Sequence, residues 1–200
     1  MEVKTLVLGI YQTNCYLIRK GNDLLVIDPG SSPRRVIEAV RELEGCALKA
    51  VLLTHGHFDH IGAVDAVRNT FNCPIYGCQD DEEIMTPGKI NDRYNMRISV
   101  SSDITWLKSS ELKIGEFDIR VLYTPGHTPG SVMYVIENDL FSGDTLFNES
   151  VGRTDLYGGS LSQLKQSLKV IETLPPDMIV YPGHEAPSTI EHELQYNPFL

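Results

Sequence analysis

The sequence predicts a single α/β domain built from two similar halves, with two sheets packed together and helices on the outside. The 200-residue chain is 42% hydrophobic, which suits one domain with a sizeable core. Apolar β-forming runs alternate with stretches of helical periodicity. Their order is strands, helix, strand, helix, and then strands, helix and strand again. This order is typical of packed sheets covered by helices.

The first half of the chain opens with closely spaced strands. Three are expected, at residues 3–8, 15–18 and 24–27. Ser32 and Pro33 are typical of the N-cap and first residue of a helix, and Gly45 is expected to stop that helix. Residues 49–53 then have the composition of a buried strand. The opening therefore predicts antiparallel strands followed by a helix and another strand.

The rest of the chain repeats this alternation. A second helix is expected from about His60, because Ile61, Val64 and Val67 recur at helical spacing. Residues 86–102 are expected to form a loop, and long loops near a site are often lids or binding loops. The other elements are expected in this order: strand 74–76, helix 79–85, hairpins 111–122 and 132–141, helix 161–171 and strand 178–181.

Charge and composition exclude several classes of protein. The net charge of −10 and pI near 5.0 argue against nucleic-acid binding, which needs clustered Lys and Arg. They do not exclude an anionic substrate, because bound metal ions reverse the local charge. The four cysteines form no Cys-x-x-Cys pair and are expected to be small buried or half-buried thiols. With no signal peptide and no apolar run of about 18 residues, a cytoplasmic protein is expected. The sequence carries no signal for the oligomeric state.

The most informative stretch is the segment at residues 54–60, Thr-His-Gly-His-Phe-Asp-His, which directly follows a predicted strand. In an extended segment, His55 and His57 project to the same side and can hold one metal ion. Asp59 and His60 project differently and can serve a second ion. Imidazole and carboxylate together suit Zn²⁺ or another first-row metal better than Ca²⁺ or Mg²⁺. An isolated histidine is more often structural, and His192 in its acidic surroundings is assigned to that class.

Four segments in this order resemble the metallo-β-lactamase superfamily: 54–60, 125–131, 142–147 and 181–184. The resemblance spans nearly the whole chain. It implies an αββα sandwich over residues 1–200, with two packed mixed sheets, helices outside and a metal site at one sheet edge. It also implies that one metal binds His55, His57 and His127, that the other binds Asp59, His60 and His184, and that Asp144 bridges them.

Within this superfamily the chain looks most like the glyoxalase II-like hydroxyacylglutathione hydrolases. The segments that carry this resemblance are 152–156, 183–185 and 197–199. It implies a hydrolase with two divalent metal ions, Zn²⁺ favoured over Fe or Mn, that cleaves a thioester such as S-lactoylglutathione. A hydroxide shared by the metals would attack the acyl carbonyl, with Asp59 and Asp144 as the catalytic carboxylates. We expect no counterpart of the C-terminal helical domain that helps full-length glyoxalase II enzymes hold glutathione, because this sequence ends at Leu200.

Other functions remain as alternatives. Segment 152–155 also occurs in persulfide dioxygenases, which would use one iron held by His55, His127 and Asp144. A nuclease is disfavoured by the acidic balance, and a flavodiiron-like role by His57, because that branch has Glu at this position. A non-enzymatic binding module is disfavoured because it would be expected to lose metal ligands, and all seven are present.

Four further residues are candidates for supporting roles. Asp28 can orient a ligand imidazole or cap a turn. Thr128 can hydrogen-bond near His127 or simply begin a Thr-Pro turn. Arg153 can bind a substrate carboxylate, but we favour a structural pairing with an acidic residue such as Asp155. Tyr157 is expected to line the substrate pocket.

Overall fold

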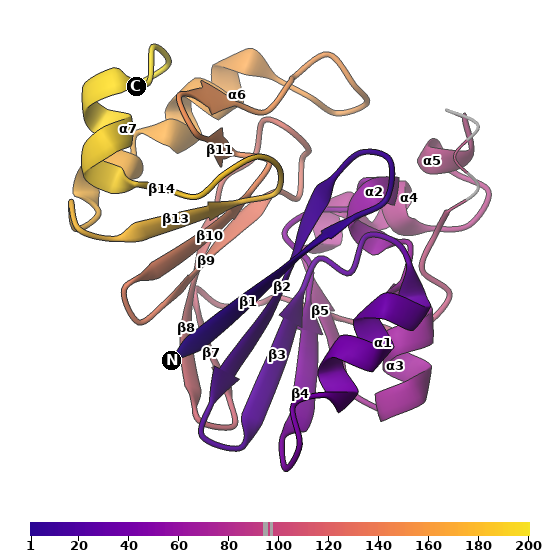
Figure 1. Cartoon of the computed structure of the whole chain (residues 1–200). Helices are drawn as coiled ribbons and strands as arrows, with labels where there is room; N and C mark the ends of the chain where they lie inside the picture. The colour runs from indigo at the N-terminus through magenta and orange to yellow at the C-terminus, as the bar shows by residue number, and fades with distance from the viewer. Residues whose placement is uncertain (94–95, 97) are drawn as a thin grey trace.

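Two six-stranded sheets pack against each other, and helices cover their outer faces (Figure 1). This computed structural model describes residues 1–93, 96 and 98–200. The first sheet comes from the N-terminal half, coloured indigo to magenta, and the second from the C-terminal half, coloured salmon to yellow. The predicted αββα sandwich is therefore confirmed.

The N-terminal sheet is mixed. Its strands lie in sequence order: β1 (Glu2–Leu8), β2 (Thr13–Lys20), β3 (Asp23–Ile27), β4 (Ala47–Leu52), β5 (Ile75–Gly77) and β6 (Ile104–Trp106). The first three strands are antiparallel, as predicted, and β3 to β6 are parallel. Parallel neighbours need crossover connections, which the helices of this half supply.

The C-terminal sheet is also mixed. Its spatial order is β14 (Ser188–Thr189), β13 (Ile179–Pro182), β10 (Asp139–Gly143), β9 (Val132–Ile136), β8 (Phe117–Tyr123) and β7 (Glu111–Ile114). Only the β10–β13 pair is parallel, because the helical segment between these strands makes the crossover. A small separate hairpin consists of β11 (Leu146–Phe147) and β12 (Ser150–Val151). Strands β6, β11, β12 and β14 were not predicted.

The helices form the two outer layers. Helices α1 (Pro33–Arg41) and α3 (Val64–Phe71) cover the N-terminal sheet, and the C-terminal sheet is covered by α6 (Leu161–Leu168), η2 (Ile171–Thr173) and α7 (Ile190–Tyr196). The short helices α2 (Phe58–Ile61), η1 (Gln79–Asp81), α4 (Glu82–Met85) and α5 (Ile90–Arg93) occur in the connections around β4 and β5.

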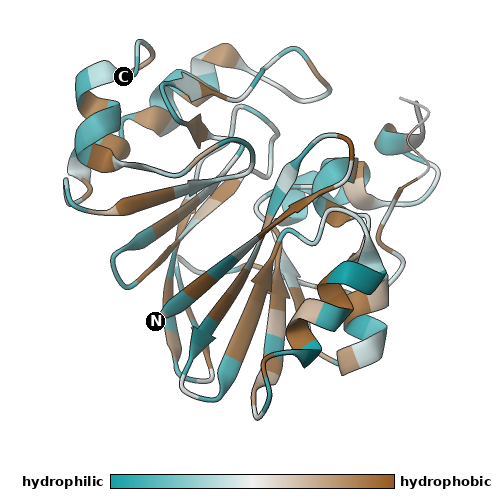
Figure 2. Cartoon of the chain, in the orientation of Figure 1, coloured by the Kyte–Doolittle hydropathy of each residue, from teal (hydrophilic) through white to brown (hydrophobic). Residues whose placement is uncertain are grey.

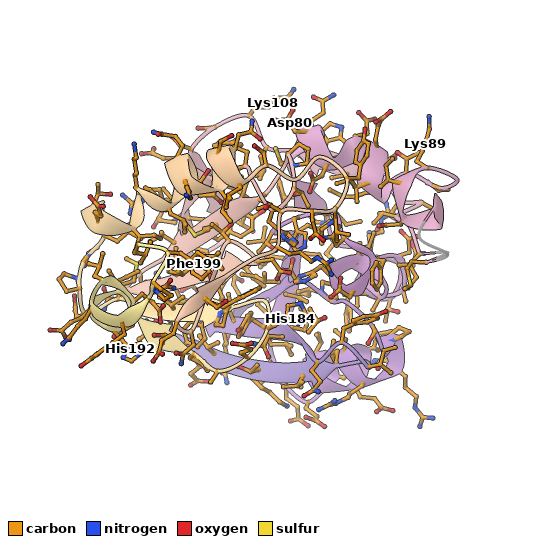
Figure 3. The ribbon with its side chains drawn as sticks, turned by 90° about the horizontal axis from the view of Figure 1, so that it is seen from above. Asp80, Lys89, Lys108, His184, His192 and Phe199 are labelled. Carbon is orange, nitrogen blue, oxygen red and sulfur yellow. The ribbon has the colours of Figure 1, made fainter. Side chains whose placement is uncertain are left out.

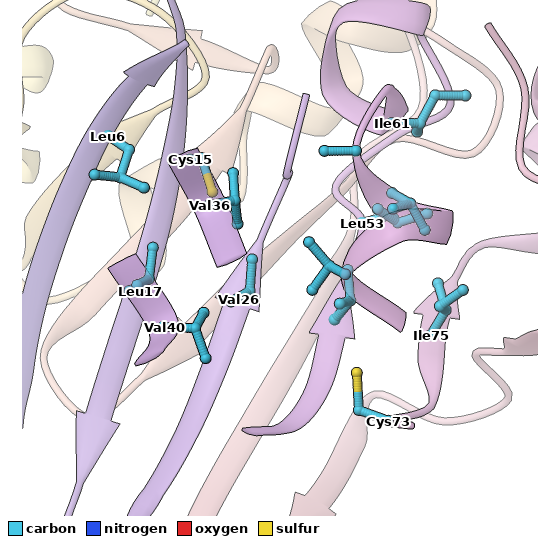
Figure 4. Close-up of a cluster of buried hydrophobic side chains, with 14 of the residues drawn as sticks. Leu6, Cys15, Leu17, Val26, Val36, Val40, Leu53, Ile61, Cys73 and Ile75 are labelled. Carbon is cyan, nitrogen blue, oxygen red and sulfur yellow. The ribbon is translucent and has the colours of Figure 1, made fainter. Parts of the chain in front are cut away.

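Alternation along the strands explains the layers. On β2, Cys15 and Leu17 pack beneath the helices, whereas Tyr16 and Ile18 pack between the two sheets. Successive residues of a strand point to opposite faces, so a strand buried on both sides must be apolar throughout. Figure 2 shows the resulting hydrophobic colouring of the strands, and Figure 4 shows the cluster beneath α1, with Val36 and Val40 facing the sheet.

One predicted helix is two helices in the structure. The helix expected from about His60 is broken at Gly62 and Ala63, which separate α2 from α3. Their N–H groups donate to the carbonyls of Gly30, at 3.0 Å, and Pro29, at 2.8 Å. These bonds to a distant segment replace helical ones, so the helical spacing alone did not reveal the break.

Other boundaries also differ from the prediction. Helix α1 ends at Arg41, before the Gly45 that was expected to stop it, and Ser32 makes no side-chain capping bond because its backbone is left-handed. The expected helix 161–171 ends at Leu168 and is followed by the 3-10 turn η2. The expected loop 86–102 contains α5, and positions 94, 95 and 97 of that loop lie outside the described residues. Helix α7 was not predicted.

The four cysteines are free thiols, and three of them are buried, which confirms that they form no disulfide framework. In the described part of the chain, no helix has the length and apolar character needed to cross a bilayer.

Candidate metal centre

The seven predicted ligands come from connections that follow strands of both sheets. His55, His57, Asp59 and His60 follow β4, and His127 lies between β8 and β9. Asp144 follows β10, and His184 follows β13. Because these strand ends meet at one edge of the sandwich, residues as far apart in the chain as His55 and His184 form one cluster. Binding and catalytic residues are often found on loops that a rigid scaffold holds in position.

The described residues contain three groups of potential ligands. One of them, Asp28 with His55 and His60, shares its two histidines with the other two groups. Those other two groups make up the cluster. His55, His57 and His127 form the first, with their ligand atoms within 4.8 Å of one another. Within it, His57 Nδ1 lies 2.9 Å from His127 Nε2, so a shared proton or a cation must lie between these nitrogens. The second group is Asp59, His60 and His184, in which His184 Nε2 lies 3.3 Å from Asp59 Oδ2. These are the two sets that the resemblance implied.

Asp144 lies between the two groups. Its Oδ1 is 3.3 Å from His60 Nε2, and its Oδ2 is 3.4 Å from His127 Nε2 and 3.6 Å from His184 Nε2. The carboxylate therefore contacts histidines of both groups, as a bridging ligand must. His192, in contrast, pairs with Glu149 at 2.9 Å and lies near the C-terminus, away from His184 (Figure 3).

Hydrogen bonds fix the orientation of the imidazoles. The Nδ1–H groups of three rings face oxygen acceptors: Asp28 Oδ2 for His60 at 2.9 Å, the Arg153 carbonyl for His127 at 2.7 Å, and the Tyr11 carbonyl for His184 at 3.1 Å. His55 Nδ1 lies 3.1 Å from the hydroxyl of Thr54, which itself donates to Asp28. Because Nδ1 carries the proton, the lone pair on Nε2 of each ring points into the cluster.

Several of these inward-facing atoms have no hydrogen-bond partner. Among the described residues, the buried atoms without one are His55 Nε2, His60 Nε2 and Asp144 Oδ1. A buried polar atom without a partner costs free energy, so native proteins rarely keep three together. Divalent cations would satisfy all three atoms, and imidazole with carboxylate is a donor set suited to first-row metals. The residues therefore fit divalent metal ions.

Burial and neighbouring charges favour the ligand forms of His55, His57 and Asp144, whereas in the absence of metal they favour a proton on His60. Burial lowers the pKa of His57 to about 3 and lowers the pKa of His55 well below its usual value, so both rings are neutral. Burial alone would raise the pKa of Asp144, but His60 and the other imidazoles hold this pKa well below the usual range. Burial opposes protonation of His60, yet Asp144 and Asp59 raise its pKa well above normal. Carboxylates that attract a proton to His60 would also attract a cation.

The four supporting candidates have distinct positions. Asp28 accepts from His60 Nδ1 and so orients this imidazole, which was one of the two roles considered for it. It also accepts from the backbone N–H of Thr54 at 2.8 Å. The Arg153 guanidinium pairs with Asp155 through two bonds of 2.7 Å, which matches the favoured structural pairing. The Thr128 hydroxyl donates to the buried carboxylate of Asp81 at 2.7 Å.

Tyr157 does not have the predicted position. Its hydroxyl donates to Glu83 Oε2 at 2.6 Å, and the described residues that line the metal cavity do not include it. This cavity has a volume of about 410 Å³ and exposes the cluster to solvent. Its walls include the rings of Tyr11, Phe58 and Phe147 beside the ligands. The bond to Glu83 holds the Tyr157 hydroxyl apart from this lining.

Asp81 is a residue that sequence reasoning missed. This carboxylate is buried and accepts from the backbone N–H groups of Gly56, at 2.8 Å, and Gly130, at 2.6 Å, besides the Thr128 hydroxyl. It therefore ties the loop that carries His55 and His57 to the loop that carries His127. Nothing in the run Asp80 to Glu83 distinguishes Asp81 in the sequence, because its partners are distant along the chain.

We expect Asp81→Ala to destabilise the fold and loosen the first ligand group. Three buried donors would lose their acceptor, which should cost about 2–4 kcal/mol of unfolding free energy. The measurement is chemical denaturation combined with metal analysis. The exposed neighbour Asp80 provides the control, and Asp80→Ala should change stability by less than about 0.5 kcal/mol. Equal stability of the two variants would contradict the tethering role.

The absence of a side chain at Gly183 leaves room for the Asp144 carboxylate. A Cβ at this position would be 2.1 Å from Asp144 Oδ1 and 2.8 Å from His60 Cε1. Gly183→Ala should therefore displace both groups and weaken metal binding by about 10–100-fold, as measured by competition with a chelator. In the control Gly77→Ala the nearest atoms are 3.6 Å from the new Cβ, so metal affinity should be unchanged. Undiminished affinity in Gly183→Ala would show that Asp144 does not act as a ligand from this position.

The comparisons with known proteins agree with this geometry. The family model described as "Metallo-beta-lactamase superfamily" matches residues 8–184. The "Probable metallo-hydrolase YqgX" of Bacillus subtilis is 37% identical over 207 residues, covering 100% of this chain and 98% of that protein. The "Hydroxyacylglutathione hydrolase GloC" of Haemophilus influenzae is 32% identical and covers 100% of this chain and 98% of that protein.

Solved structures show the same likeness. The BLEG-1 B3 metallo-beta-lactamase superposes with a TM-score of 0.92 at 40% identity, covering 100% of this chain and 99% of that one. The protein TTHA1623, solved in a di-iron-bound form, gives a TM-score of 0.88 at 35% identity and covers 99% and 100% of the two chains.

Proposed function

The chain belongs to the metallo-beta-lactamase superfamily, and on this basis we propose that it is a binuclear metal-dependent hydrolase that cleaves a thioester such as S-lactoylglutathione. The observation that carries the proposal is the position of Asp144 between two complete ligand groups at the base of an open cavity. Two ligand groups that share a carboxylate suit two ions, for which we favour Zn²⁺ over Fe or Mn.

Two bound divalent cations would supply a hydroxide nucleophile at neutral pH and stabilise negative charge on the acyl oxygen. The chain's own residues hold this arrangement in place. Asp28 and the carbonyls of Arg153 and Tyr11 orient three of the imidazoles. Asp59 Oδ2 accepts from the hydroxyl of Thr13 at 3.1 Å, and the neighbouring imidazoles lower its pKa to about 2 against the effect of burial. Asp59 therefore remains an ionised carboxylate at the cavity wall.

Three considerations support a thioester as the substrate class. A thiolate is a stable leaving group near neutral pH, so the reaction needs no strong general acid. The described residues that line the cavity include no Lys or Cys. The similar protein GloC is named a hydroxyacylglutathione hydrolase, which supports glutathione as the thiol carrier.

The persulfide dioxygenase is the second candidate, and a specific contact favours it. Asp144 Oδ2 lies 3.4 Å from His127 Nε2 and 4.0 Å from His55 Nε2, so these residues can form a triad of two histidines and one carboxylate around one iron. The complete second group with Asp59, His60 and His184 favours two ions. Iron as the only bound metal, with oxygen consumed in the presence of glutathione persulfide, would decide for the dioxygenase.

The direct test is hydrolysis of S-lactoylglutathione by the full chain loaded with Zn²⁺, Fe²⁺ or Mn²⁺. We expect turnover that stops with chelator and returns when metal is added back. If the metal-loaded protein releases no thiol from any thioester in a panel of acyl groups and carriers, the proposed function is wrong.

A further inference from the structure

An apolar pocket adjoins the metal cavity. Its volume is about 280 Å³, and its apolar walls include Leu8, Ile10, Tyr11, Phe58 and Ile98. Ile10 lies in the turn between β1 and β2, and Phe58 begins α2. The pocket therefore forms where the β1–β2 turn lies beside the segment that carries Asp59.

The apolar pocket and the metal cavity meet at shared residues. Tyr11, Phe58 and Asp59 line both of them, and Asp59 is one of the predicted ligands. The rings of Tyr11 and Phe58 touch edge to face, with 5.1 Å between their centroids. The Tyr11 carbonyl also accepts from Nδ1 of His184. A group held in the apolar pocket is therefore next to the second ligand group.

The β1–β2 turn exposes large side chains beside the apolar pocket. Ile10 is 87% exposed and Tyr11 is 45% exposed, although both side chains are large and apolar. Contiguous exposed apolar surface beside a site is typical of ligand contact. An apolar cavity of about 150 Å³ is enough to hold a benzene molecule, so this larger pocket can hold an aromatic ring or a short alkyl chain.

We propose that the apolar pocket binds the acyl group of the substrate. Thioesters with an apolar alkyl or aryl acyl group are therefore cleaved in preference to S-lactoylglutathione, whose lactoyl group carries a hydroxyl. The inference rests on the proposed thioesterase function for the identity of this group. Size and polarity assign the acyl group rather than the thiol carrier. The larger metal cavity, about 410 Å³, includes Ser150, Arg153 and Glu185 in its walls and suits a larger polar carrier. The smaller apolar pocket suits the smaller apolar part.

The test measures binding without turnover. The Zn²⁺-loaded full chain is titrated calorimetrically with acetate, butanoate, hexanoate and octanoate, which are carboxylate products of such thioesters. We expect the Kd to fall by about fourfold for each methylene that enters the apolar pocket and then to level off. A Kd that does not change with chain length would overturn the inference.

Two variants locate the effect. Ile10→Ala removes part of the wall and should weaken hexanoate binding about fivefold more than acetate binding. Ser31→Leu adds volume to a residue that lines the pocket, so the series should level off at a shorter chain. Val7→Ala is the matched control, because Val7 is 47% exposed on the same hairpin and is absent from the described lining. If both lining variants behave like Val7→Ala, the acyl group does not bind there.

Turnover of a thioester series separates this inference from the proposed function. The inference would be overturned if neither the rate of thioester hydrolysis nor the Kd of the carboxylates changed with chain length. The thioesterase proposal would still stand in that case. A chain-length dependence of carboxylate binding without hydrolysis of any thioester would overturn the proposed function but support the apolar pocket as a subsite of the metal centre.

Discussion

Asp144→Ala should lower kcat/KM for thioester hydrolysis by about 10³-fold and reduce the metal content from two ions to one or none per chain. Asp144 contacts imidazoles of both groups, at 3.3 Å from His60 Nε2 and 3.4 Å from His127 Nε2. Its loss would remove a ligand from both ions. The substitution would also remove the negative charge that offsets the positive charge of a cation among the buried imidazoles.

Metal analysis and steady-state kinetics together check this expectation. Asp118→Ala is the control. The Asp118 side chain lies on β8, is 80% exposed, and within the described part of the chain forms a salt bridge with Lys113 alone. This variant should keep the metal content and activity of the unmodified protein. Full metal content and full activity in Asp144→Ala would show that the bridging assignment is wrong.

Removal of the metal ions should abolish hydrolysis and lower the Tm by about 16–32 °C. Each of two independently bound ions, present at about a thousand times its Kd, stabilises the native state by about 4 kcal/mol. For a chain of this size each kcal/mol shifts the Tm by about 2–4 °C. The structural reason is the set of buried atoms that lack hydrogen-bond partners: His55 Nε2, His60 Nε2 and Asp144 Oδ1.

Calorimetry with and without chelator measures this shift. Adding Zn²⁺ back should restore both the Tm and the activity, which separates loss of metal from irreversible damage. A chelated protein shown to be metal-free, but with an unchanged Tm, would mean that the cluster is stable without ions. The electrostatic account of the cluster would then fail.

The sequence predicted the parts of the site that are local. His55, His57, Asp59 and His60 stand within six residues, so their chemistry is visible without a fold. The other three ligands, His127, Asp144 and His184, were identified through motif order, and the structure brings all seven together. That they bind metal stays a prediction. The layers were predictable because strands buried on both faces and amphipathic helices have distinct periodicities.

The parts that escaped prediction depend on long-range contacts. The break between α2 and α3 follows from bonds to Pro29 and Gly30, more than thirty residues earlier in the chain. Asp81 acts through Gly56 and Gly130, which are 25 and 49 residues away. The apolar pocket likewise combines residues near 10, 58 and 98. Periodicity describes one element at a time, so it cannot show which distant loops an element will meet.

The central claim, a thioester hydrolase that needs two metal ions, is tested most directly by titrating metal-free protein with Zn²⁺ while measuring thioester hydrolysis. We predict little activity at up to one equivalent, a rise between one and two, and a plateau at two equivalents per chain. Full activity at one equivalent would contradict the two-ion centre. The absence of hydrolysis at every equivalent, from protein that has bound two ions, would contradict the thioesterase itself.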